Sequence, residues 1–217
     1  MAIGLRSVQE SIVAAAKRAG VDPSGISLIA VSKQQSDESL LAAYDEGQRR
    51  FGENRQQALA ARIDRGLPDD IEWHFIGRLQ RRKVQSVATH AVLVQSFDRL
   101  ELIPTWPHDG PPVLLQFNIG EEPQKGGFRA EEAEAVAAQV RDAGIEVVGV
   151  MAIPPFEREP ERSRPHFAAL RAVFDRLASD DPLITVCSMG MSNDYPVAIE
   201  EGATMVRVGT AVFGPRS

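Results

Sequence analysis

The chain alternates between short apolar runs and longer stretches in which apolar residues recur at helical spacing. Stretches such as SLLAAYDEG, NRQQALAARIDRG and AEEAEAVAAQVRDAG predict amphipathic helices that end at a glycine. Strands alternating with helices are typical of a parallel sheet covered on both faces. Eight strand-like runs favour a closed (β/α)8 barrel of the TIM type. The predicted strands lie at residues 26–31, 49–52, 71–77, 91–96, 111–119, 145–153, 183–190 and 204–209.

The leading segment, residues 7–20, predicts an extra helix before the first strand. Its SVQE sequence fits a capping box, with Ser7 as N-cap and Glu10 reaching back. The proline-rich piece at 154–165 reads as one long loop, so we expect a single domain spanning residues 1–217. An open doubly wound sheet is the alternative. No glycine-rich dinucleotide turn follows the first strand, although many open sheets also lack one.

Composition narrows the class of protein. A net charge of −6 argues against an extended nucleic-acid or anionic-membrane surface, although a small polyanion could still bind locally. The single Cys187 excludes a disulfide within the chain and favours a reducing compartment. The first 20 residues lack the apolar core of a signal peptide, and no run approaches a membrane span, so we expect a cytoplasmic protein. The four histidines show no metal-ligand spacing, and no metal is assigned.

Lys33 stands directly after the first predicted strand, and Ser36 with Asp37 and Glu38 predicts a helix start just beyond it. In a barrel, the carboxyl ends of the strands form the active face. A lysine amine partly withdrawn from water becomes a nucleophile toward aldehydes. On position alone, a lysine that merely solvates a strand end is the simpler alternative.

The last two loops, SMGMSND and RVGTAVFG, fit an anion site. Gly190 and Gly209 let backbone N–H groups approach an anion, Ser192 and Thr210 offer hydroxyls, and a helix starting near Asn193 would point its positive end inward. The alternative is that these residues only form caps and turns. A nucleophilic lysine together with a phosphate cup predicts an aldehyde that carries a phosphate ester. Pyridoxal 5′-phosphate (PLP) fits both ends.

Several ordered motifs carry a resemblance. They are AVSK (30–33), EGQRRFGEN (46–54), EWHFIG (72–77), VMAIP (150–154), SMGMSND (188–194) and MVRVGTAVFG (205–214). With them, the chain resembles the YggS/PROSC family of pyridoxal-phosphate homeostasis proteins nearly from end to end. The resemblance implies a barrel similar to that of alanine racemase, with PLP held as a Schiff base on Lys33.

The resemblance also implies roles for individual residues. Ser192, Gly209 and Thr210 match the positions that hold the cofactor phosphate. Arg207 matches the position that faces the pyridine nitrogen, where a cation disfavours protonation and makes the ring a weaker electron sink.

Three further positions match residues near the cofactor or at the barrel mouth. Asn54 and His74 match family positions near PLP, with a buried structural histidine as the alternative for His74. Met191, like Met189, either contacts the ring or fills the barrel mouth, and we favour filling.

Racemisation needs a second acid or base across the cofactor. The chain has two tyrosines that could be this group: Tyr44 lies on a predicted helix, and Tyr195 lies beside the phosphate loop. The sequence stops at Ser217. We therefore expect a monomeric carrier of PLP for apo-enzymes with little or no turnover. The alternatives are a fold-type III racemase or lyase whose second base is water or Tyr195, and a barrel that binds another phosphorylated metabolite without a Schiff base.

The chain departs from the family after HFIG, where RLQRRK replaces the usual Pro-Leu-Gln-Ser-Asn-Lys. Arg78, Arg81, Arg82 and Lys83 form a cluster that is read most simply as a solvated basic face. Altered entry to the site, or a second bound anion, are the alternatives. Arg55 also stands where an aromatic residue or lysine is commoner.

Overall fold

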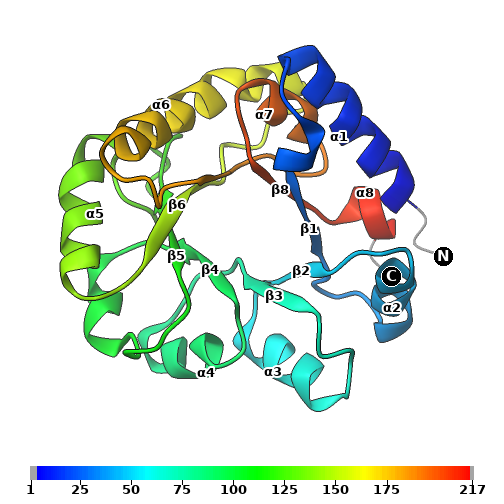
Figure 1. The fold of residues 1–217 in the computed structure, drawn as a ribbon, viewed down its shortest axis with the longest axis horizontal. Helices are drawn as coiled ribbons and strands as arrows, with labels where there is room; N and C mark the ends of the chain where they lie inside the picture. Colours follow the sequence, from blue (N-terminus) through cyan, green and yellow to red (C-terminus); the bar gives the residue numbers. More distant parts are fainter. Residues whose placement is uncertain (1–3, 216–217) are drawn as a thin grey trace.

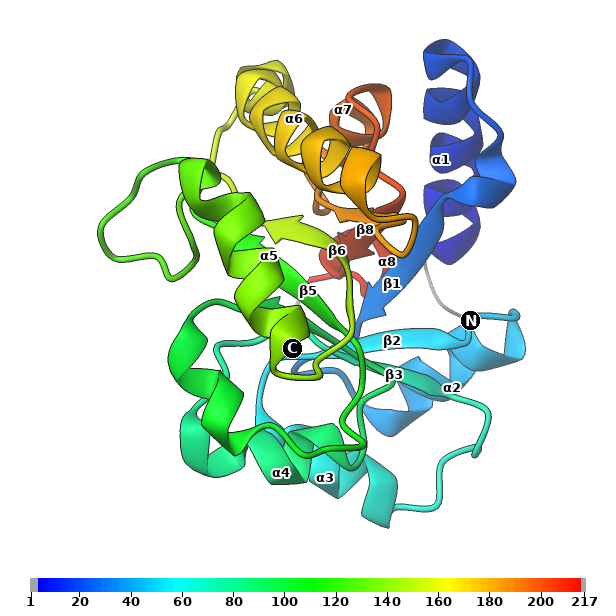
Figure 2. The same ribbon diagram turned by 60° about the vertical axis from the view of Figure 1, so that its left-hand side comes forward.

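The computed structural model describes residues 4–215. Eight parallel strands pair in chain order and close into a barrel, and helices surround it (Figures 1 and 2). This confirms the predicted (β/α)8 architecture. The strands are β1 (Ser27–Val31), β2 (Arg50–Glu53), β3 (Glu72–Phe75), β4 (Leu93–Phe97), β5 (Val113–Phe117), β6 (Val147–Ala152), β7 (Val186–Ser188) and β8 (Met205–Val208).

The α-helices follow the strands around the outside of the barrel. They are α1 (Leu5–Ala19), α2 (Asp37–Asp45), α3 (Gln56–Asp64), α4 (Val84–Ala88), α5 (Ala133–Asp142), α6 (Arg164–Asp180), α7 (Tyr195–Glu200) and α8 (Thr210–Phe213). Short 3-10 helices lie at η1 (Pro23–Gly25), η2 (Arg81–Lys83), η3 (Leu100–Thr105), η4 (Ala130–Glu132) and η5 (Pro160–Ser163). Within residues 4–215, no helix combines the length and apolar character needed to cross a membrane.

The β4–β5 connection differs from the regular alternation, because η3 takes the place of an α-helix there. Pro104 lies inside η3, and Pro107, Pro111 and Pro112 follow it. Proline lacks a backbone N–H and clashes with the preceding helical turn, so this segment cannot continue as an α-helix.

The extra N-terminal helix α1 packs against α7 and α8 (Figure 1). It begins at Leu5 with Gly4 as N-cap and no side-chain cap, so the predicted Ser7 capping box is wrong. Contact with α8, and not a local cap, sets the residue at which α1 begins. The Gly4 N–H donates to the carbonyl of Val212 at 3.0 Å, and a Cβ on Gly4 would lie only 1.8 Å from the carbonyl oxygen of Ala211.

Apolar side chains form two separate clusters. On β1, Leu28 and Ala30 pack in the large cluster between the strands and the helices, whereas Ile29 belongs to a smaller cluster of strand residues. Alternate strand residues point to opposite faces, so this smaller cluster fills the barrel interior. Its buried members are Ile29, Leu93, Leu114, Met151 and Met205.

Candidate functional site

Four neighbouring strands carry the predicted site residues to one rim of the barrel. β7, β8, β1 and β2 are consecutive in the closed sheet. Lys33 follows β1, Asn54 follows β2, Ser192 follows β7 and Gly209 follows β8. Because the carboxyl ends of parallel strands share one rim, the structure brings these four residues to the face where TIM barrels place their sites.

Lys33 lies in a tight turn between β1 and α2, and it is half-buried. The next residue, Gln34, has φ +62°, which is uncommon for a residue with a side chain. The helix α2 then starts with Ser36 as N-cap, whose hydroxyl accepts the backbone N–H of Ser39 at 3.2 Å. This confirms the helix start predicted from the sequence and holds Lys33 at the rim.

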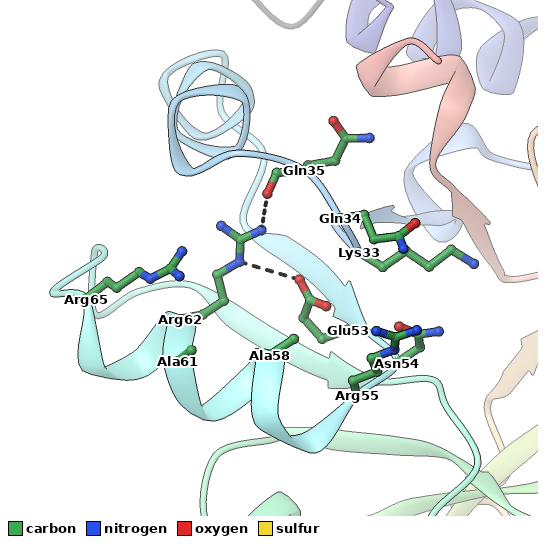
Figure 3. A pocket seen from close by; sticks show the side chains of 10 residues that line it. All are labelled: Lys33, Gln34, Gln35, Glu53, Asn54, Arg55, Ala58, Ala61, Arg62 and Arg65. Atoms are coloured by element: carbon green, nitrogen blue, oxygen red, sulfur yellow. Dashed lines mark hydrogen bonds and ion pairs between the residues drawn. The ribbon is translucent and has the colours of Figure 1, made fainter. Parts of the chain in front are cut away.

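A cavity of about 390 Å³ lies beside Lys33, between the β1–α2 turn and α3 (Figure 3). Glu53 at the end of β2 lines it, and its side chain is almost completely buried. The hydroxyl of Ser32 donates to Glu53 Oε1 at 2.8 Å, and Arg62 Nε lies 3.5 Å from the same oxygen. Glu53 Oε2 has no hydrogen-bond partner among residues 4–215. Burial raises the pKa of Glu53, although Ser32 and Arg62 act in the opposite direction.

Arg62 fixes the turn that carries Lys33. Its guanidinium reaches from α3 and donates to the side chain of Asp37 and to the carbonyl of Gln35, the latter at 2.5 Å. In Figure 3, Arg62 bridges this turn and Glu53, whereas the Lys33 side chain extends away from Arg62. Sequence reasoning missed both Glu53 and Arg62. A carboxylate directly after the buried pair Phe51 and Gly52 was the available signal.

Backbone amides of the β8–α8 loop converge on the β7–α7 loop. The N–H of Gly209 and the N–H of Ala211 both donate to the hydroxyl oxygen of Ser192, at 3.2 and 3.4 Å. Amides that share one acceptor oxygen form a site of the kind that binds phosphate oxygens. Two loops that are far apart from Lys33 in sequence thus place hydrogen-bond donors on the same rim.

The helix after this loop, α7, begins at Tyr195 with Asp194 as its N-cap, in agreement with the start predicted near Asn193. Asp194 Oδ1 accepts the N–H of Met191 at 2.7 Å and closes the loop. Ser192 turns toward the β8–α8 loop, and Asn193 donates to the carbonyl of Glu157 at 2.9 Å. Ser192 and Asn193 thus lie in the turn before α7, and neither of them is its N-cap.

Arg207 begins a chain of hydrogen bonds inside the barrel. Its Nη1 donates to Ser188 Oγ at 2.5 Å and its Nη2 donates to the carbonyl of Ala152 at 2.7 Å. Ser188 in turn donates to Gln95 Oε1 at 2.7 Å, and Gln95 Nε2 lies 3.0 Å from His74 Nδ1. An arginine can only donate hydrogen bonds, so Ser188 accepts from Arg207 and uses its own proton to donate to the carbonyl oxygen of Gln95. The amide nitrogen of Gln95 then donates to His74. His74 Nδ1 must accept, and its proton lies on Nε2.

Burial sets the charges at the two ends of this chain. It lowers the pKa of His74 to about 3, with the positive charge of Arg50 acting in the same direction, so the ring is neutral near pH 7. Burial also lowers the pKa of Arg207 to about 10, opposed by the nearby Asp194, and the guanidinium stays charged. The barrel therefore holds one buried cation on β8, next to the loop that carries Gly209.

The remaining predicted residues occupy different environments. Met191 is half-buried in the β7–α7 loop, Thr210 is exposed, and Asn54 lines the cavity beside Lys33. Met189 is fully buried and belongs to the cluster between the strands and the helices, so, contrary to our expectation, it packs outside the barrel and does not fill the barrel mouth. Among residues 4–215 there is no group of three His, Cys, Asp or Glu side chains that could hold a metal ion.

Comparison with known proteins matches the whole length of this barrel. The family model for the N-terminal domain of alanine racemase matches residues 3–217. The pyridoxal phosphate homeostasis protein of Escherichia coli K12 is 39% identical over 227 residues, which cover 100% of this chain and 97% of the relative. The chain belongs to the pyridoxal phosphate homeostasis protein family. The family member of Aquifex aeolicus is 37% identical over 220 residues, covering 98% of this chain and 96% of that protein.

A solved relative shares the fold of this family member. PipY of Synechococcus elongatus, in its structure with PLP bound, superimposes with a TM-score of 0.80 at 31% identity. The match covers 95% of this chain and 100% of PipY. The resemblance to pyridoxal-phosphate homeostasis proteins that the motifs indicated is thus confirmed at the level of the family and the fold.

Proposed function

We propose that this pyridoxal phosphate homeostasis family member binds PLP at the carboxyl rim, with Lys33 as the residue that attaches its aldehyde as a Schiff base. The observation that carries the proposal is the shared rim. A half-buried lysine after β1 shares this rim with a site after β7 and β8 where two backbone amides meet on one oxygen. The PLP-bound structure of PipY, which matches nearly the whole chain, supports the same ligand.

The residues at the rim suit each chemical part of PLP. PLP supplies an aldehyde that condenses with a primary amine, which Lys33 offers. The amides of Gly209 and Ala211, with the hydroxyl of Ser192, suit the phosphate. The buried cation of Arg207 suits an unprotonated pyridine nitrogen, because a positive charge beside that nitrogen disfavours its protonation.

Four other residues complete the proposed site. Asn54 borders the cavity beside Lys33, whereas Met191 and Thr210 belong to the two loops proposed to hold the phosphate. His74 does not contact PLP directly in this proposal, because its hydrogen-bond partner inside the barrel is Gln95.

The proposed role is to store PLP and release it to apo-enzymes, with little or no amino-acid turnover. Neither tyrosine supports a second acid–base group. The Tyr44 hydroxyl donates to Asp70 at 2.5 Å outside the barrel, and Tyr195 is buried in α7. We further propose that the protein is a monomer in the cytoplasm. Its one cysteine, Cys187, is buried and free, which suits a reducing compartment.

A titration followed by a transfer assay tests this role. We expect PLP to bind the wild type and the Lys17→Ala control, which removes an exposed lysine of α1, with the absorption of a Schiff base. We expect Lys33→Ala to lack that absorption. Wild type loaded with PLP should then reactivate an apo PLP-dependent enzyme while it leaves free amino acids unchanged. Turnover of amino acids at enzymatic rates would contradict the carrier role, and failure of the wild type to bind PLP would overturn the whole proposal.

A further inference from the structure

Three adjoining hollows run along the carboxyl rim from Lys33 toward β4. The cavity beside Lys33 shares Asn54 and Arg55 with a second hollow at the ends of β2 and β3. That second hollow shares Arg78 and Gln80 with a third, which reaches the residues after β4. The three hollows therefore lie next to one another along the rim as a groove, and Lys33 lines the innermost one.

The walls of this groove are strongly cationic. Arg81 and Arg82 are exposed, and neither forms an ion pair with any residue of the described chain. Glu53 is the one acidic side chain in the walls within residues 4–215, and it is buried at the inner end. We call this surface the arginine groove, and it is defined by Arg55, Arg78, Arg81, Arg82 and Arg99.

Asp98, at the outer end, pairs with Arg78 and Arg99 and offsets only part of this positive charge. Asp98 lies behind Arg78 and Arg99, and only 3% of its side chain is exposed. Burial raises the pKa of Asp98, although both arginines act in the opposite direction. The groove therefore presents guanidinium groups to solvent while the carboxylate stays behind them.

Hydrogen bonds between side chains hold the two walls of the groove together. Lys83 Nζ donates to Gln57 Oε1 at 3.1 Å, and Gln56 Nε2 donates to Ser86 Oγ at 2.7 Å. These bonds join the start of α3 to η2 and α4. The position of the arginine-bearing segment relative to β2, and so to Lys33, is thus fixed by the fold.

We propose that the arginine groove gathers phosphate-bearing ligands from solution and guides them to Lys33. The inference rests on the proposed function, because the ligand that reaches Lys33 is taken to be PLP. The chain carries a net charge of −6, which opposes the long-range approach of a dianion. A cationic cleft raises the local concentration of an oppositely charged ligand, and with it the association rate, by factors of about 10 to 1,000.

The groove favours a small anion over an acidic protein as its ligand because it is continuous with the cavity beside Lys33. The middle hollow, of about 150 Å³, has the size of a small anion and is too small to hold part of a docked protein. Removing positive charge along the path should therefore slow entry of the ligand without altering how it is held once it has arrived.

Rapid-mixing measurements of PLP association test the proposal. The main variant is Arg78→Gln/Arg81→Gln/Arg82→Gln. Because Arg78 lies 3.9 Å from the buried Asp98, a second variant, Arg81→Gln/Arg82→Gln, leaves that pair intact. The control carries Arg6→Gln, Lys17→Gln and Arg18→Gln on α1 and removes an equal number of positive charges from a helix outside the groove. Two of these charges are paired, because Arg6 lies 4.0 Å from Glu46 and Arg18 lies 2.7 Å from Glu200.

We expect the association rate constant of the main variant to fall about tenfold at about 0.01 M salt, where charges act over about 30 Å. The difference should shrink at about 1 M salt, and the dissociation rate should stay within about twofold. The α1 control, and binding of pyridoxal, which has no phosphate, should also change by less than about twofold.

Any of four results would overturn the proposal. Groove variants could associate as fast as wild type, or the α1 control could slow as much as the groove variants. A change confined to dissociation would mean that the arginines contact bound ligand, and a loss of transfer to apo-enzyme without slower association would assign the groove to an acidic protein. Failure of the wild type to bind PLP is a separate result, because it removes the proposed function itself.

Discussion

Arg207 on β8 donates a hydrogen bond to the hydroxyl of Ser188 on β7 at 2.5 Å, inside the closed barrel. The same guanidinium also donates to the carbonyl of Ala152 on β6. Because Ser188 in turn donates to Gln95 on β4, the cation is held by groups from three other strands. The position of this charge is therefore set by barrel closure and not by its own strand alone.

Gln95→Leu should destabilise the fold. The substitution leaves the hydroxyl proton of Ser188 and the Nδ1 of His74 without partners in the barrel interior. Each buried polar group left unsatisfied costs about 1–3 kcal/mol, so for these two groups we expect a loss of about 2–6 kcal/mol in the free energy of unfolding. Urea denaturation measures it. Gln139→Leu on the exposed face of α5 should stay within about 0.5 kcal/mol, and an equally small effect at Gln95 would disprove the importance of the chain.

His74 should make the fold sensitive to acid. Its pKa is about 3 in the folded protein, below the ordinary value of 6.5, so the folded state disfavours protonation of the ring. The stabilisation is complete above pH 6.5 and is lost as the pH falls from 6.5 toward 3, because only the unfolded chain then takes up the proton. Between pH 7 and about pH 4 this effect amounts to about 2–4 kcal/mol.

The His74→Gln variant isolates this contribution, since glutamine keeps an acceptor for Gln95 but does not titrate. We expect its unfolding free energy to fall less steeply with acid than that of the wild type, measured by urea denaturation across the same range. His108→Gln, at a side chain that is 99% exposed, should follow the wild type. Parallel curves for wild type and His74→Gln would contradict the assignment of a neutral buried ring.

Ser192→Ala should weaken retention of the phosphate. Its hydroxyl lies where the amides of Gly209 and Ala211 converge, and a hydrogen bond to a charged group contributes about 1.5–3 kcal/mol. We therefore expect the dissociation constant for PLP to rise about tenfold or more. Isothermal titration measures the change. Pyridoxal, which lacks the phosphate, should bind both proteins alike, and an equal loss for pyridoxal would show that Ser192 acts elsewhere than on the phosphate.

The barrel could be predicted from the sequence because its strands are apolar runs separated by helical periods. The exact helix starts that are set by tertiary contacts could not be predicted. The start of α1 depends on how closely Gly4 approaches α8, and local cap chemistry at Ser7 has no bearing on that distance. Likewise, Asp194 is the N-cap of α7 without a side-chain cap, and its carboxylate instead accepts the N–H of Met191 in the preceding loop.

The candidate site was predictable where one residue lies at the end of one strand, as with Lys33. The interior chain was not predictable, because Gln95 and Ser188 look like ordinary polar residues of separate strands. Their meeting depends on the register of β4, β7 and β8 around the closed sheet. Glu53 and Arg62 were missed for a related reason, since an ion pair between β2 and α3 leaves no periodic signal in the sequence.

The most direct test of the account is to find where PLP attaches. The protein is mixed with PLP and reduced with borohydride, which makes a Schiff base permanent, and its peptides are then mapped by mass spectrometry. We expect one modified peptide with the adduct on Lys33, and no adduct at that turn in Lys33→Ala. An adduct mainly on another lysine, or bound PLP without any reducible bond, would contradict the claim that this rim is built around Lys33.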